Sequence, residues 1–514
     1  GFATRAALSF GGIEPGDFRK VLIYNKDRVF AFVLALGDVS DEWYAAAAGC
    51  INYGFPTIAD TPIPQILPTG VCTYEHVVSN IPHSEIVAKA IEVRGLKVTV
   101  TEVPVPVAYG PAFEGERIRG EDIYMEAGGG KTQAVELTVM KEMNEVEDGK
   151  VELIGPDLKD MQPGTRVPLG ILVEVAGRKM QTDFEPILER QIHHLINYAQ
   201  GLMHIGQRDI AWVRVGKGAV EKGFTLSHIG SILHAKFHQD FGSVLDKVQV
   251  KIFTDKEEVD KLLAQARNAY TKRDARVEGM TDEDEPIFYS CTLCQSFAPS
   301  HVCVVTPERT GLCGAYNWLD CKASFEINPT GPNQPIEKGK VLDERLGQWE
   351  GVNQFVERAS RGKVQKYNAY SIMEDPMTSC GCFECIAAVL PVCNGVMSVD
   401  RDYKGPTPCG MKFTTLAGSA GGGNITPGFV GHSKLYIGSK KFVAAEGGIL
   451  RLVWLPKALK EMLRDKINTR GEEMGVSNLA DRIADETVGV TEDEIYPFLQ
   501  EKEHPALTMD PIVG

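Results

Sequence analysis

The sequence predicts a multidomain α/β protein with three consecutive α/β or α+β domains, the last of which carries a metal cluster. Three observations lead to this prediction. A chain of 514 residues with 43% hydrophobic content is long enough for several cores. Strand-like and helix-like patterns alternate along it. Of its 12 cysteines, all but two lie between Cys291 and Cys409. We place the domains at 1–105, 106–280 and 281–514.

The first domain reads as the C-terminal part of a Rossmann-like α/β domain. VFAFVLAL (29–36) and FPTIAD (55–60) are strand-like, and EWYAAAAGCINYG (42–54) is helix-like and ends in glycine. Residues 1–10 lack an initiator methionine and a cleavable signal pattern. We therefore expect a fragment from which most of the N-terminal domain is missing. The proline-rich segment VPVPVAYGP (103–111) is the expected linker.

The middle domain contains clear helix and strand signals. Apolar side chains recur at helical spacing over 187–203, and Asp183 is the expected cap of that helix. DIAWVRV (209–215) predicts a strand, and the charged segment 255–279 predicts a helix. The acidic stretch TDEDEP (281–286) marks the expected start of the last domain.

Composition excludes several classes of partner. The formal net charge of −15 and the pI of about 5.3 argue against nucleic-acid or anionic-membrane binding, which needs a basic surface. No apolar run approaches the roughly 20 residues that span a bilayer. Clustered cysteines in a large acidic chain are typical of metal binding in a reducing compartment. We expect a cytoplasmic protein.

Three motifs look functional but favour structural roles. AGGGKT (127–132) resembles a phosphate-binding loop, yet Met125 occupies a required glycine position, so we expect a plain turn. The glycines of LAGSAGGG (416–423) favour a close backbone approach. His193 and His194 are adjacent, point to different helix faces and should not chelate a metal together.

Trp212 and Arg214 alternate along the strand predicted at 209–215 and therefore share one face. One interpretation is a half-buried sheet position. The other is one side of a site for an anionic, adenine-bearing ligand, because tryptophan stacks and arginine pairs with phosphate.

The strongest chemical signal is the run Cys291, Cys294, Cys303 and Cys313, with spacing C-x2-C-x8-C-x9-C. Four thiolates with a tight first pair hold either tetrahedral zinc or a [4Fe–4S] cubane. Zinc ribbons usually show two tight pairs. Only the first pair is tight here, so the spacing favours the cubane.

The segment TSCGCFECI (378–386) adds a second signal, because Cys380 and Cys382 flank Gly381. Two thiolates at this spacing, with the backbone nitrogens of Gly381 and Cys382, form a nearly planar N2S2 chelate. That donor set selects Ni(II) or Cu(II). Glycine suits such a loop because it has no side chain. A chance pair of cysteines and a pair of zinc ligands remain the alternatives.

These cysteine motifs resemble acetyl-CoA synthase, the nickel enzyme of the reductive acetyl-CoA pathway, in its bacterial form. The resemblance runs from near the N-terminus to the last residues. The segments that carry it are CTLCQSFAPSHVC (291–303), TPERTGLCG (306–314), MTSCGCFE (377–384), GPAFEGERIR (110–119), INYAQGLMHIGQR (196–208), GPNQPI (331–336) and HPALTMDP (504–511).

The resemblance implies a role for each metal ligand. The four cysteines of the run would bind the [4Fe–4S] cluster, and Cys294 would also bridge to a proximal nickel. Cys380 and Cys382 would bridge that nickel to a distal one, which the backbone nitrogens of Gly381 and Cys382 complete. Phe297 would wall the open coordination position. Copper or zinc is expected to displace the proximal nickel in some preparations.

The resemblance also implies the reaction and the partners. The enzyme would condense a methyl group from a corrinoid iron–sulfur protein, CO and coenzyme A into acetyl-CoA. Family members dock a CO dehydrogenase subunit through the domain that is mostly missing here, and ferredoxin is a further candidate partner. Trp212 and Arg214 are the candidate coenzyme A residues. An iron–sulfur oxidoreductase and a scaffold subunit stapled by zinc or a cluster are the two alternatives.

Two features depart from the family pattern. Cys321, Cys385 and Cys409 stand where the family has small residues without a thiol, and we expect them to be bystanders. Met203 stands where the family has a tryptophan associated with coenzyme A, which leaves that site open.

Overall fold

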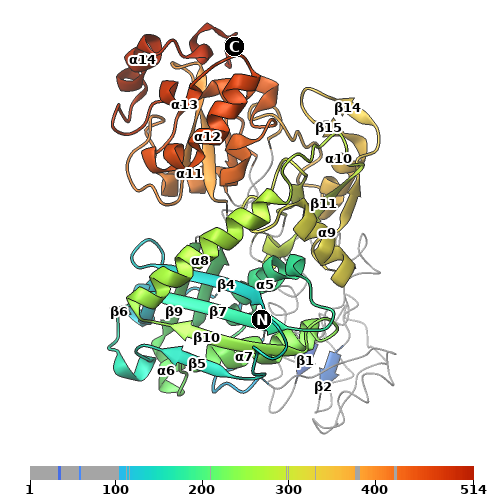
Figure 1. Ribbon diagram of the computed structural model, residues 1–514, viewed down its shortest axis with the longest axis vertical. Coiled ribbons are helices and arrows are strands. Elements are labelled where there is room, and N and C mark those ends of the chain that lie inside the picture. Colours follow the sequence, from blue (N-terminus) through green and yellow to red (C-terminus); the bar gives the residue numbers. More distant parts are fainter. Residues whose placement is uncertain are drawn as a thin grey trace, which may run out of the picture. The chain divides into compact units, whose positions relative to one another are not determined.

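The computed structural model describes residues 33–35, 57–59, 103–110, 113–114, 116–208, 210–296, 298, 300–329, 331–376, 383–421 and 425–513 (Figure 1). The chain divides into two compact units. Unit 1 comprises Gly1–Thr182, Gln191–Gly206 and Ile210–Leu263; unit 2 comprises Asp183–Arg190, Gln207–Asp209 and Ala264–Gly514. The predicted mixed α/β, multidomain architecture is confirmed, and the three-domain boundaries remain a prediction.

Unit 1 contains a four-stranded mixed sheet with the order β4-β7-β10-β5. Both β4–β7 and β10–β5 pair in parallel, whereas β10–β7 is antiparallel. All eight residues of β7 are buried, which explains why its sequence LGILVEVA is apolar except for Glu174. The Glu174 carboxylate accepts a hydrogen bond from the Gln249 amide at 3.0 Å. The strands are β4 (Ala134–Met140), β5 (Val151–Ile154), β7 (Leu169–Ala176) and β10 (Lys247–Phe253).

A second sheet of unit 1 has the order β6-β3-β9-β8. Its strands are β3 (Ile123–Gly128), β6 (Thr165–Arg166), β8 (Leu202–Gln207) and β9 (Ile210–Gly216). The strand predicted at 209–215 is therefore confirmed as β9. The glycines of AGGGKT make the turn between β3 and β4, with φ of +72°, +64° and +77° at Gly128, Gly129 and Gly130. The plain-turn interpretation of this motif is confirmed.

Helices follow the strands of these two sheets in the chain or lie between them. α6 (Lys217–Glu221) and α7 (Ser227–Phe241) belong to unit 1, and α7 packs against β10 and β5. α8 (Lys256–Ala275) confirms the predicted charged helix. β1 (Val33–Ala35) and β2 (Thr57–Ala59) form a parallel pair inside the strands predicted near the start. The helix predicted at 42–54 lies outside the described residues.

The helix predicted over 187–203 is shorter than expected. α5 spans Glu185–Asn197, and Leu202 already belongs to β8. The Asn197 side chain donates to the His204 carbonyl at 2.7 Å and accepts from the His204 N–H at 2.6 Å. Gly201, with φ of +79°, completes the reversal. Asp183, the expected cap, lies before α5 and its carboxylate pairs with Arg276.

The first part of unit 2 holds the small sheet β12-β11-β13 and the pair β14-β15. The Trp318 indole at the start of α9 donates to the Ile287 carbonyl at 2.9 Å, which fixes α9 against β11. The elements are β11 (Ile287–Cys291), β12 (Cys303–Val305), β13 (Pro335–Glu337), β14 (Val341–Asp343), β15 (Gln348–Trp349), α9 (Trp318–Ile327) and α10 (Glu350–Ala359).

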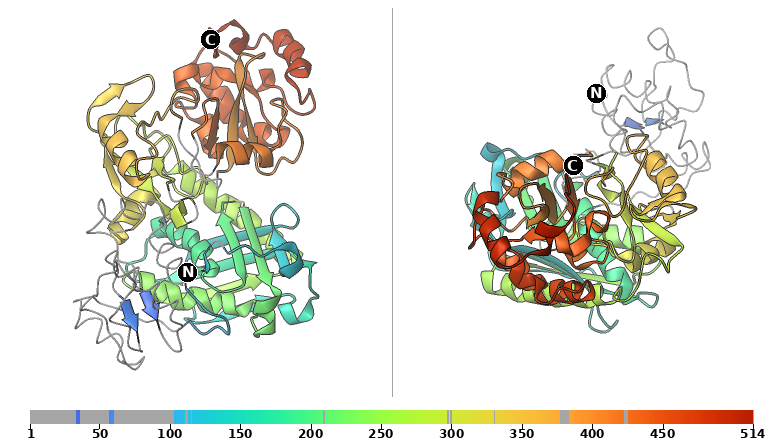
Figure 2. Two further views of the ribbon diagram at one scale, coloured as in Figure 1. Left: turned by 180° about the vertical axis from the view of Figure 1, so that it is seen from behind. Right: turned by 90° about the horizontal axis from the view of Figure 1, so that it is seen from above.

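The rest of unit 2 is a four-stranded sheet, β18-β16-β17-β19, among helices (Figure 2). Its core gathers Phe442, Leu452, Leu459 and Ile467, which are almost fully buried. The elements are β16 (Cys385–Leu390), β17 (Gly395–Asp400), β18 (Phe429–His432), β19 (Leu452–Trp454), α11 (Phe413–Ala420), α12 (Lys457–Glu473), α13 (Leu479–Arg482) and α14 (Glu492–Glu501). None of the described helices has the length and apolar character needed to cross a membrane.

Candidate functional site

The four-cysteine run includes two residues at one end of the antiparallel β11–β12 pair in unit 2. Cys291 ends β11 and lies directly opposite Cys303, the first residue of the antiparallel strand β12. Cys294 lies in the 3-10 turn Leu293–Ser296, and Cys313 lies in the turn that follows β12. None of these four cysteines forms a disulfide with another described residue. Cys313, 22 positions after Cys291 in the sequence, lies near enough for the charges of the two groups to interact. That all four cysteines bind one cluster remains a prediction.

Two side chains donate to these sulfurs. The buried Arg190 guanidinium lies 3.8 Å from Cys294 Sγ, within hydrogen-bond reach of sulfur. His301 Nε2 lies 3.1 Å from Cys303 Sγ, and burial lowers the pKa of His301 to about 4. His301 is therefore neutral at pH 7, and an N–H on Nε2 would point at the sulfur. Such N–H to sulfur contacts are typical of thiolate ligands in metal centres.

The Cys291 thiol needs a nearby cation to ionise at neutral pH. Desolvation first, and the neighbouring Cys313 second, raise the pKa of Cys291 to about 11. With a pKa of about 11, the Cys291 thiol is protonated at pH 7 when no cation is near it. Bound metal ions would supply the positive charge that stabilises a thiolate. The residues present therefore fit a cationic metal group.

The spacing of the sulfurs bears on which group fits. Cys291 and Cys303 lie opposite each other on β11 and β12, whereas Cys294 and Cys313 lie in turns beyond these strands. A tetrahedral zinc with four Zn–S bonds of about 2.3 Å brings its sulfurs to about 3.8 Å apart. A cubane attaches each thiolate to a different iron and spreads the sulfurs more widely.

Cys380, Gly381, Cys382 and Phe297 lie outside the described residues. The described chain resumes at Phe383, immediately after the CGC motif.

At that point the chain is anchored beside the cysteine run. The Glu384 N–H donates to the Leu312 carbonyl at 3.0 Å, and Leu312 precedes Cys313. Gly314, at φ +71°, leaves room for the Glu384 carboxylate, which a β-carbon there would meet at 2.5 Å. Lys434 N–H holds that carboxylate at 2.8 Å.

The additional thiols occupy different surroundings. Cys385 begins β16 and is fully buried, and Cys409 is partly exposed beside Thr407 at 3.2 Å. Cys321 on α9 accepts from the Asn333 amide at 3.3 Å. Desolvation, followed by the nearby Cys291, raises the pKa of Cys321 well above its ordinary value. Cys321 is thus the extra thiol that lies near the predicted cluster ligands.

Trp212 and Arg214 share a face of β9, as the alternation predicted. The Arg214 guanidinium carbon lies 4.4 Å from the Trp212 ring centre. The Arg214 and Trp212 side chains both donate to the buried Glu126 carboxylate, at 2.9 Å and 3.2 Å. Lys131 and Arg166 contact the other oxygen of Glu126 at 2.7 Å and 3.2 Å. Three cations thus surround one carboxylate, which leaves local positive charge.

Electrostatics confirm that Glu126 is ionised. Burial opposes its ionisation, but hydrogen bonds from Lys131, Arg214 and Trp212 outweigh burial and lower the pKa of Glu126 to about 2. Met203, at the expected tryptophan position, is partly buried in β8 of the same sheet.

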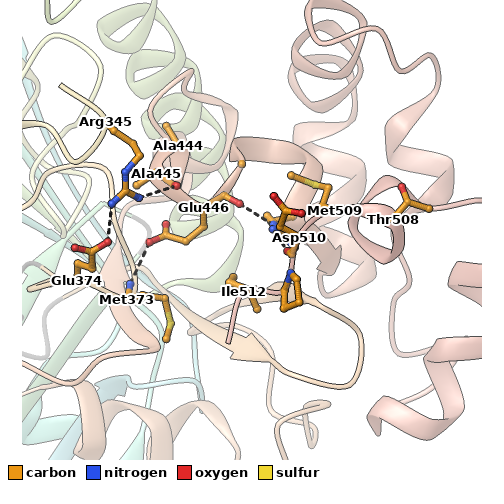
Figure 3. Close-up of a pocket in the computed structure, with 13 residues that line it drawn as sticks. Arg345, Met373, Glu374, Ala444, Ala445, Glu446, Thr508, Met509, Asp510 and Ile512 are labelled. Atoms are coloured by element: carbon orange, nitrogen blue, oxygen red, sulfur yellow. Dashed lines mark hydrogen bonds and ion pairs between the residues drawn. The ribbon is translucent and has the colours of Figure 1, made fainter. Parts of the chain in front are cut away.

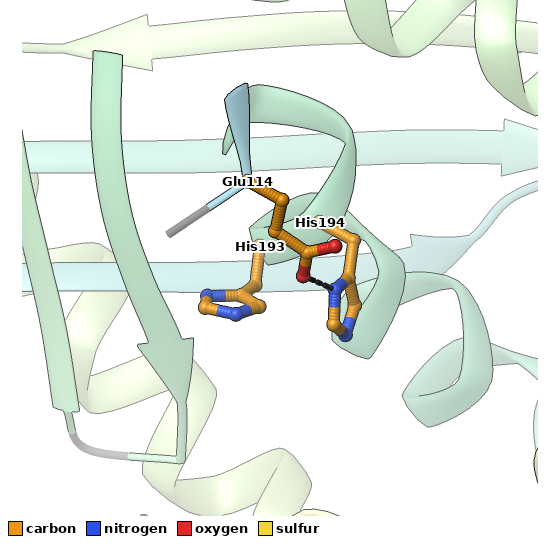
Figure 4. A group of neighbouring side chains, drawn as sticks. All are labelled: Glu114, His193 and His194. Atoms are coloured by element: carbon orange, nitrogen blue, oxygen red, sulfur yellow. Dashed lines mark hydrogen bonds and ion pairs between the residues drawn. The ribbon is translucent and has the colours of Figure 1, made fainter. Parts of the chain in front are cut away.

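The prediction that His193 and His194 diverge is wrong. Glu114, His193 and His194 bring one donor atom each to within 4.8 Å of one another (Figure 4). The two rings are 4.6 Å apart, and Glu114 Oε1 lies 2.5 Å from His194 Nδ1. Both histidines are buried, and His193 Nδ1 accepts from the Gly206 N–H at 3.1 Å. The helical step separates their Cα–Cβ bonds, but side-chain rotation turns both rings toward Glu114.

A polar cavity of about 760 Å³ also opens in unit 2 (Figure 3). Arg345 at its wall contacts Glu374 at 2.7 Å and the Ala445 carbonyl at 3.2 Å. Arg451 donates to the Asp510 carbonyl at 2.6 Å. Its arginines already have partners and no predicted site residue lines it, so we assign it no role.

Comparison with known proteins decides the family. A family model described as the beta component of the CO dehydrogenase/acetyl-CoA synthase complex matches residues 105–259, and a model of the C-terminal part of the ACS/CODH beta chain matches residues 270–513. The alpha chain of carbon monoxide dehydrogenase/acetyl-CoA synthase from Moorella thermoacetica is 51% identical over 100% of this chain and 70% of that protein. The chain belongs to the acetyl-CoA synthase family.

Further members of the acetyl-CoA synthase family match over different lengths. The beta 1 component of the acetyl-CoA decarbonylase/synthase complex of Methanocaldococcus jannaschii is 43% identical over 98% of this chain and 65% of that protein. The beta component from Methanopyrus kandleri is 46% identical over 78% of this chain and 85% of that protein. A solved C-terminal domain of an acetyl-coenzyme A synthase alpha chain is 57% identical over 26% of this chain and 100% of that chain, with a TM-score of 0.25.

Sequence reasoning missed the residues that support the cysteines of this acetyl-CoA synthase family member. His301 had a signal, because it lies two residues before Cys303 and alternate strand residues share a face. Arg190 had none, since it lies 104 residues from Cys294. Glu126 also had none, because 88 residues separate it from Arg214.

Proposed function

We propose that this chain forms acetyl-CoA from a methyl group, CO and coenzyme A at a centre that combines a [4Fe–4S] cluster with two nickel ions. Family membership supports acetyl-CoA synthesis. The observation that carries the metal assignment is the neighbourhood of Cys291, Cys294, Cys303 and Cys313, beside which the chain resumes after the CGC motif. The sequence spacing C-x2-C-x8-C-x9-C, with only its first pair tight, favours the cubane over a zinc scaffold.

In this proposal the protein supplies ligands and a shaped surrounding. The four cysteines of the run would hold the cubane, and Cys380, Gly381 and Cys382 would hold nickel. When bound, the nickel would offer open positions where the methyl group and CO meet, so that joining them is intramolecular. Arg190 and His301 would donate to thiolate sulfur and orient the ligands.

The Glu126 cluster is our proposed coenzyme A contact. Coenzyme A carries phosphates and an adenine ring, which the surplus positive charge of Lys131, Arg166 and Arg214 and the face of Trp212 are suited to bind. Glu126 would hold Arg214 in place rather than touch the ligand. A corrinoid iron–sulfur protein would donate the methyl group, and CO dehydrogenase would supply the CO. The name of the Moorella thermoacetica relative includes carbon monoxide dehydrogenase.

Anaerobic metal analysis of the purified chain tests the proposal. We expect iron near four and nickel near two per chain, about one cubane and a dinuclear nickel site. Cys382→Ser should abolish acetyl-CoA formation and lower nickel while iron stays near four. Cys409→Ser, a partly exposed thiol outside both motifs, is the matched control and should retain both metals and activity.

Two results would overturn parts of this assignment. Zinc alone, without iron or nickel in a chain kept from oxygen, would favour a zinc-stapled scaffold. Full activity and unchanged nickel in Cys382→Ser would remove the CGC motif from the centre.

A further inference from the structure

A second histidine cluster lies in unit 1 and shares no residue with the Glu126 cluster. His234 and His238 are one turn apart on α7 and project from the same side of the helix. Asp148 lies in the loop between β4 and β5. Its Oδ1 atom is 3.1 Å from His234 Nε2 and 2.8 Å from His238 Nε2, and the two rings are 4.7 Å apart. One oxygen and two ring nitrogens therefore converge on one point.

The three donor atoms lie within 4.8 Å of one another, near enough to become neighbouring ligands of one metal ion. Zinc binds imidazole nitrogen at about 2.0–2.1 Å and carboxylate oxygen at about 2.0–2.2 Å, so adjacent donors are about 3.0–3.5 Å apart. The i, i+4 histidine pair is the spacing by which a helix offers two imidazoles to a single ion. A small adjustment of the side chains would admit the ion.

Hydrogen bonding alone crowds this oxygen. Asp148 Oδ1 is also the acceptor of the Val248 N–H at 3.0 Å, so three donors meet at one atom. A carboxylate oxygen has about two lone-pair directions. A metal ion would relieve this crowding, because both imidazoles would then direct lone pairs at the ion and Val248 would remain the single N–H donor.

The ligands are held by the fold and not only by one another. The Val248 N–H belongs to β10 and orients the carboxylate, while the Gly149 N–H donates to the Val248 carbonyl at 3.0 Å. On the opposite side of α7, Ile229 is fully buried. The helix and the loop are thus anchored independently, as a preorganised metal site requires.

The donor set defines the class of ion. Two imidazoles and one carboxylate suit zinc, nickel or cobalt, whereas calcium and magnesium prefer oxygen ligands alone. Between 29% and 43% of each of the three side chains is exposed to solvent. Water would therefore fill the remaining coordination positions. We propose that Asp148, His234 and His238 form a surface site for one divalent transition-metal ion, with zinc as its representative.

Zinc binding to the full, iron- and nickel-loaded chain tests this site. Equilibrium dialysis against Zn²⁺ should show one more equivalent per chain in the wild type than in the double variant His234→Gln/His238→Gln. Asp148→Asn, which keeps the shape of the side chain, should raise the zinc concentration for half-saturation about tenfold or more. Asp240→Asn is the matched control, because Asp240 lies on the same helix and pairs with Lys236 instead.

The difference in zinc between wild type and double variant isolates this site from any zinc bound elsewhere. The X-ray absorption spectrum of the zinc bound at this site should show two imidazoles in the coordination shell. Equal zinc content in the wild type, the double variant and Asp148→Asn, with circular dichroism and iron content unchanged, would overturn the proposal and leave a hydrogen-bonded triad.

Discussion

At the scale of single residues, Glu126 shows how one buried carboxylate organises a basic surface. Its oxygens contact Lys131, Arg166 and Arg214, and only about 3% of the Glu126 side chain is exposed. An ionised carboxylate is buried at tolerable cost only when it is paired and hydrogen-bonded. The same contacts hold the Arg214 guanidinium over the Trp212 ring. Glu126 thus fixes the geometry of Trp212 and Arg214, the two residues that we propose contact the ligand.

The low pKa of Glu126 predicts a pH-dependent stability. Because the folded pKa of about 2 lies below the ordinary value of 4.5, ionised Glu126 stabilises the fold above pH 4.5, and this contribution is lost as the pH falls toward 2. Glu126→Gln should melt at a lower temperature than the wild type at pH 7, and the difference should shrink between pH 4.5 and 2. Thermal unfolding followed by circular dichroism measures both.

Glu121→Gln, an exposed glutamate in the turn before β3, is the control and should melt like the wild type at every pH. A constant difference between Glu126→Gln and wild type across the pH range would contradict the prediction.

At the scale of elements, α7 packs closely against β5 because Gly230 on α7 has no side chain. A β-carbon at Gly230 on α7 would meet the Val151 methyl carbons at 2.5 Å and 2.8 Å. Valine is stiff at χ1 and cannot turn aside easily. Glycine ordinarily costs a helix about 1 kcal/mol relative to alanine. Close packing therefore outweighs helix propensity at this position.

Gly230→Ala should therefore destabilise the chain. Overpacking costs about 1–3 kcal/mol, which exceeds or matches the gain of about 1 kcal/mol in helix propensity. Gly218→Ala on α6 is the matched control, because no atom lies within 4 Å of its β-carbon, and it should be neutral or slightly stabilising. Urea unfolding compares the two. Stabilisation of equal size in both variants would show that Val151 yields freely.

At the scale of the whole molecule, unit 2 takes in short segments from earlier in the chain. Gln207–Asp209 belongs to unit 2, although the residues on either side belong to unit 1. Arg208 there is buried and pairs with Asp274 on α8. Desolvation raises the pKa of Asp274, and the charge of Arg208 opposes that rise. Removal of Arg208 would leave the Asp274 carboxylate, about 15% of whose side chain is exposed, without this partner.

Arg208→Met should lower the free energy of unfolding by about 3–5 kcal/mol. Arg178→Met is the control: Arg178 pairs with Asp246 at the surface, where solvent screens the ion pair, so this variant should unfold nearly like the wild type. Arg208→Met/Asp274→Leu should regain most of the loss, because an apolar pair needs no charge compensation. Urea unfolding measures all three variants. A double variant as unstable as Arg208→Met would show that the carboxylate is not the cause.

The amino-acid sequence by itself determined what depends on near neighbours. Strand alternation predicted β9, helical periodicity predicted α8, and cysteine spacing predicted the shared neighbourhood of Cys291 and Cys303. Periodicity failed at the end of α5, because apolar residues continue at helical spacing past Asn197 while its side chain reverses the chain. The metal roles of the CGC motif and Phe297 remain predictions.

Only the tertiary structure decided which distant residues meet. It brought Glu114 to His194, Glu126 to Arg214, and the residues after the CGC motif to Leu312. It also brought Asp148 to His234 and His238 across 86 and 90 residues. Local sequence patterns reflect the backbone preference of each residue and the burial of one face of a helix or strand. Both properties depend on residues that are close together in the sequence. Convergence depends on how sheets pair and helices pack, and those long-range choices leave no periodic trace in the sequence.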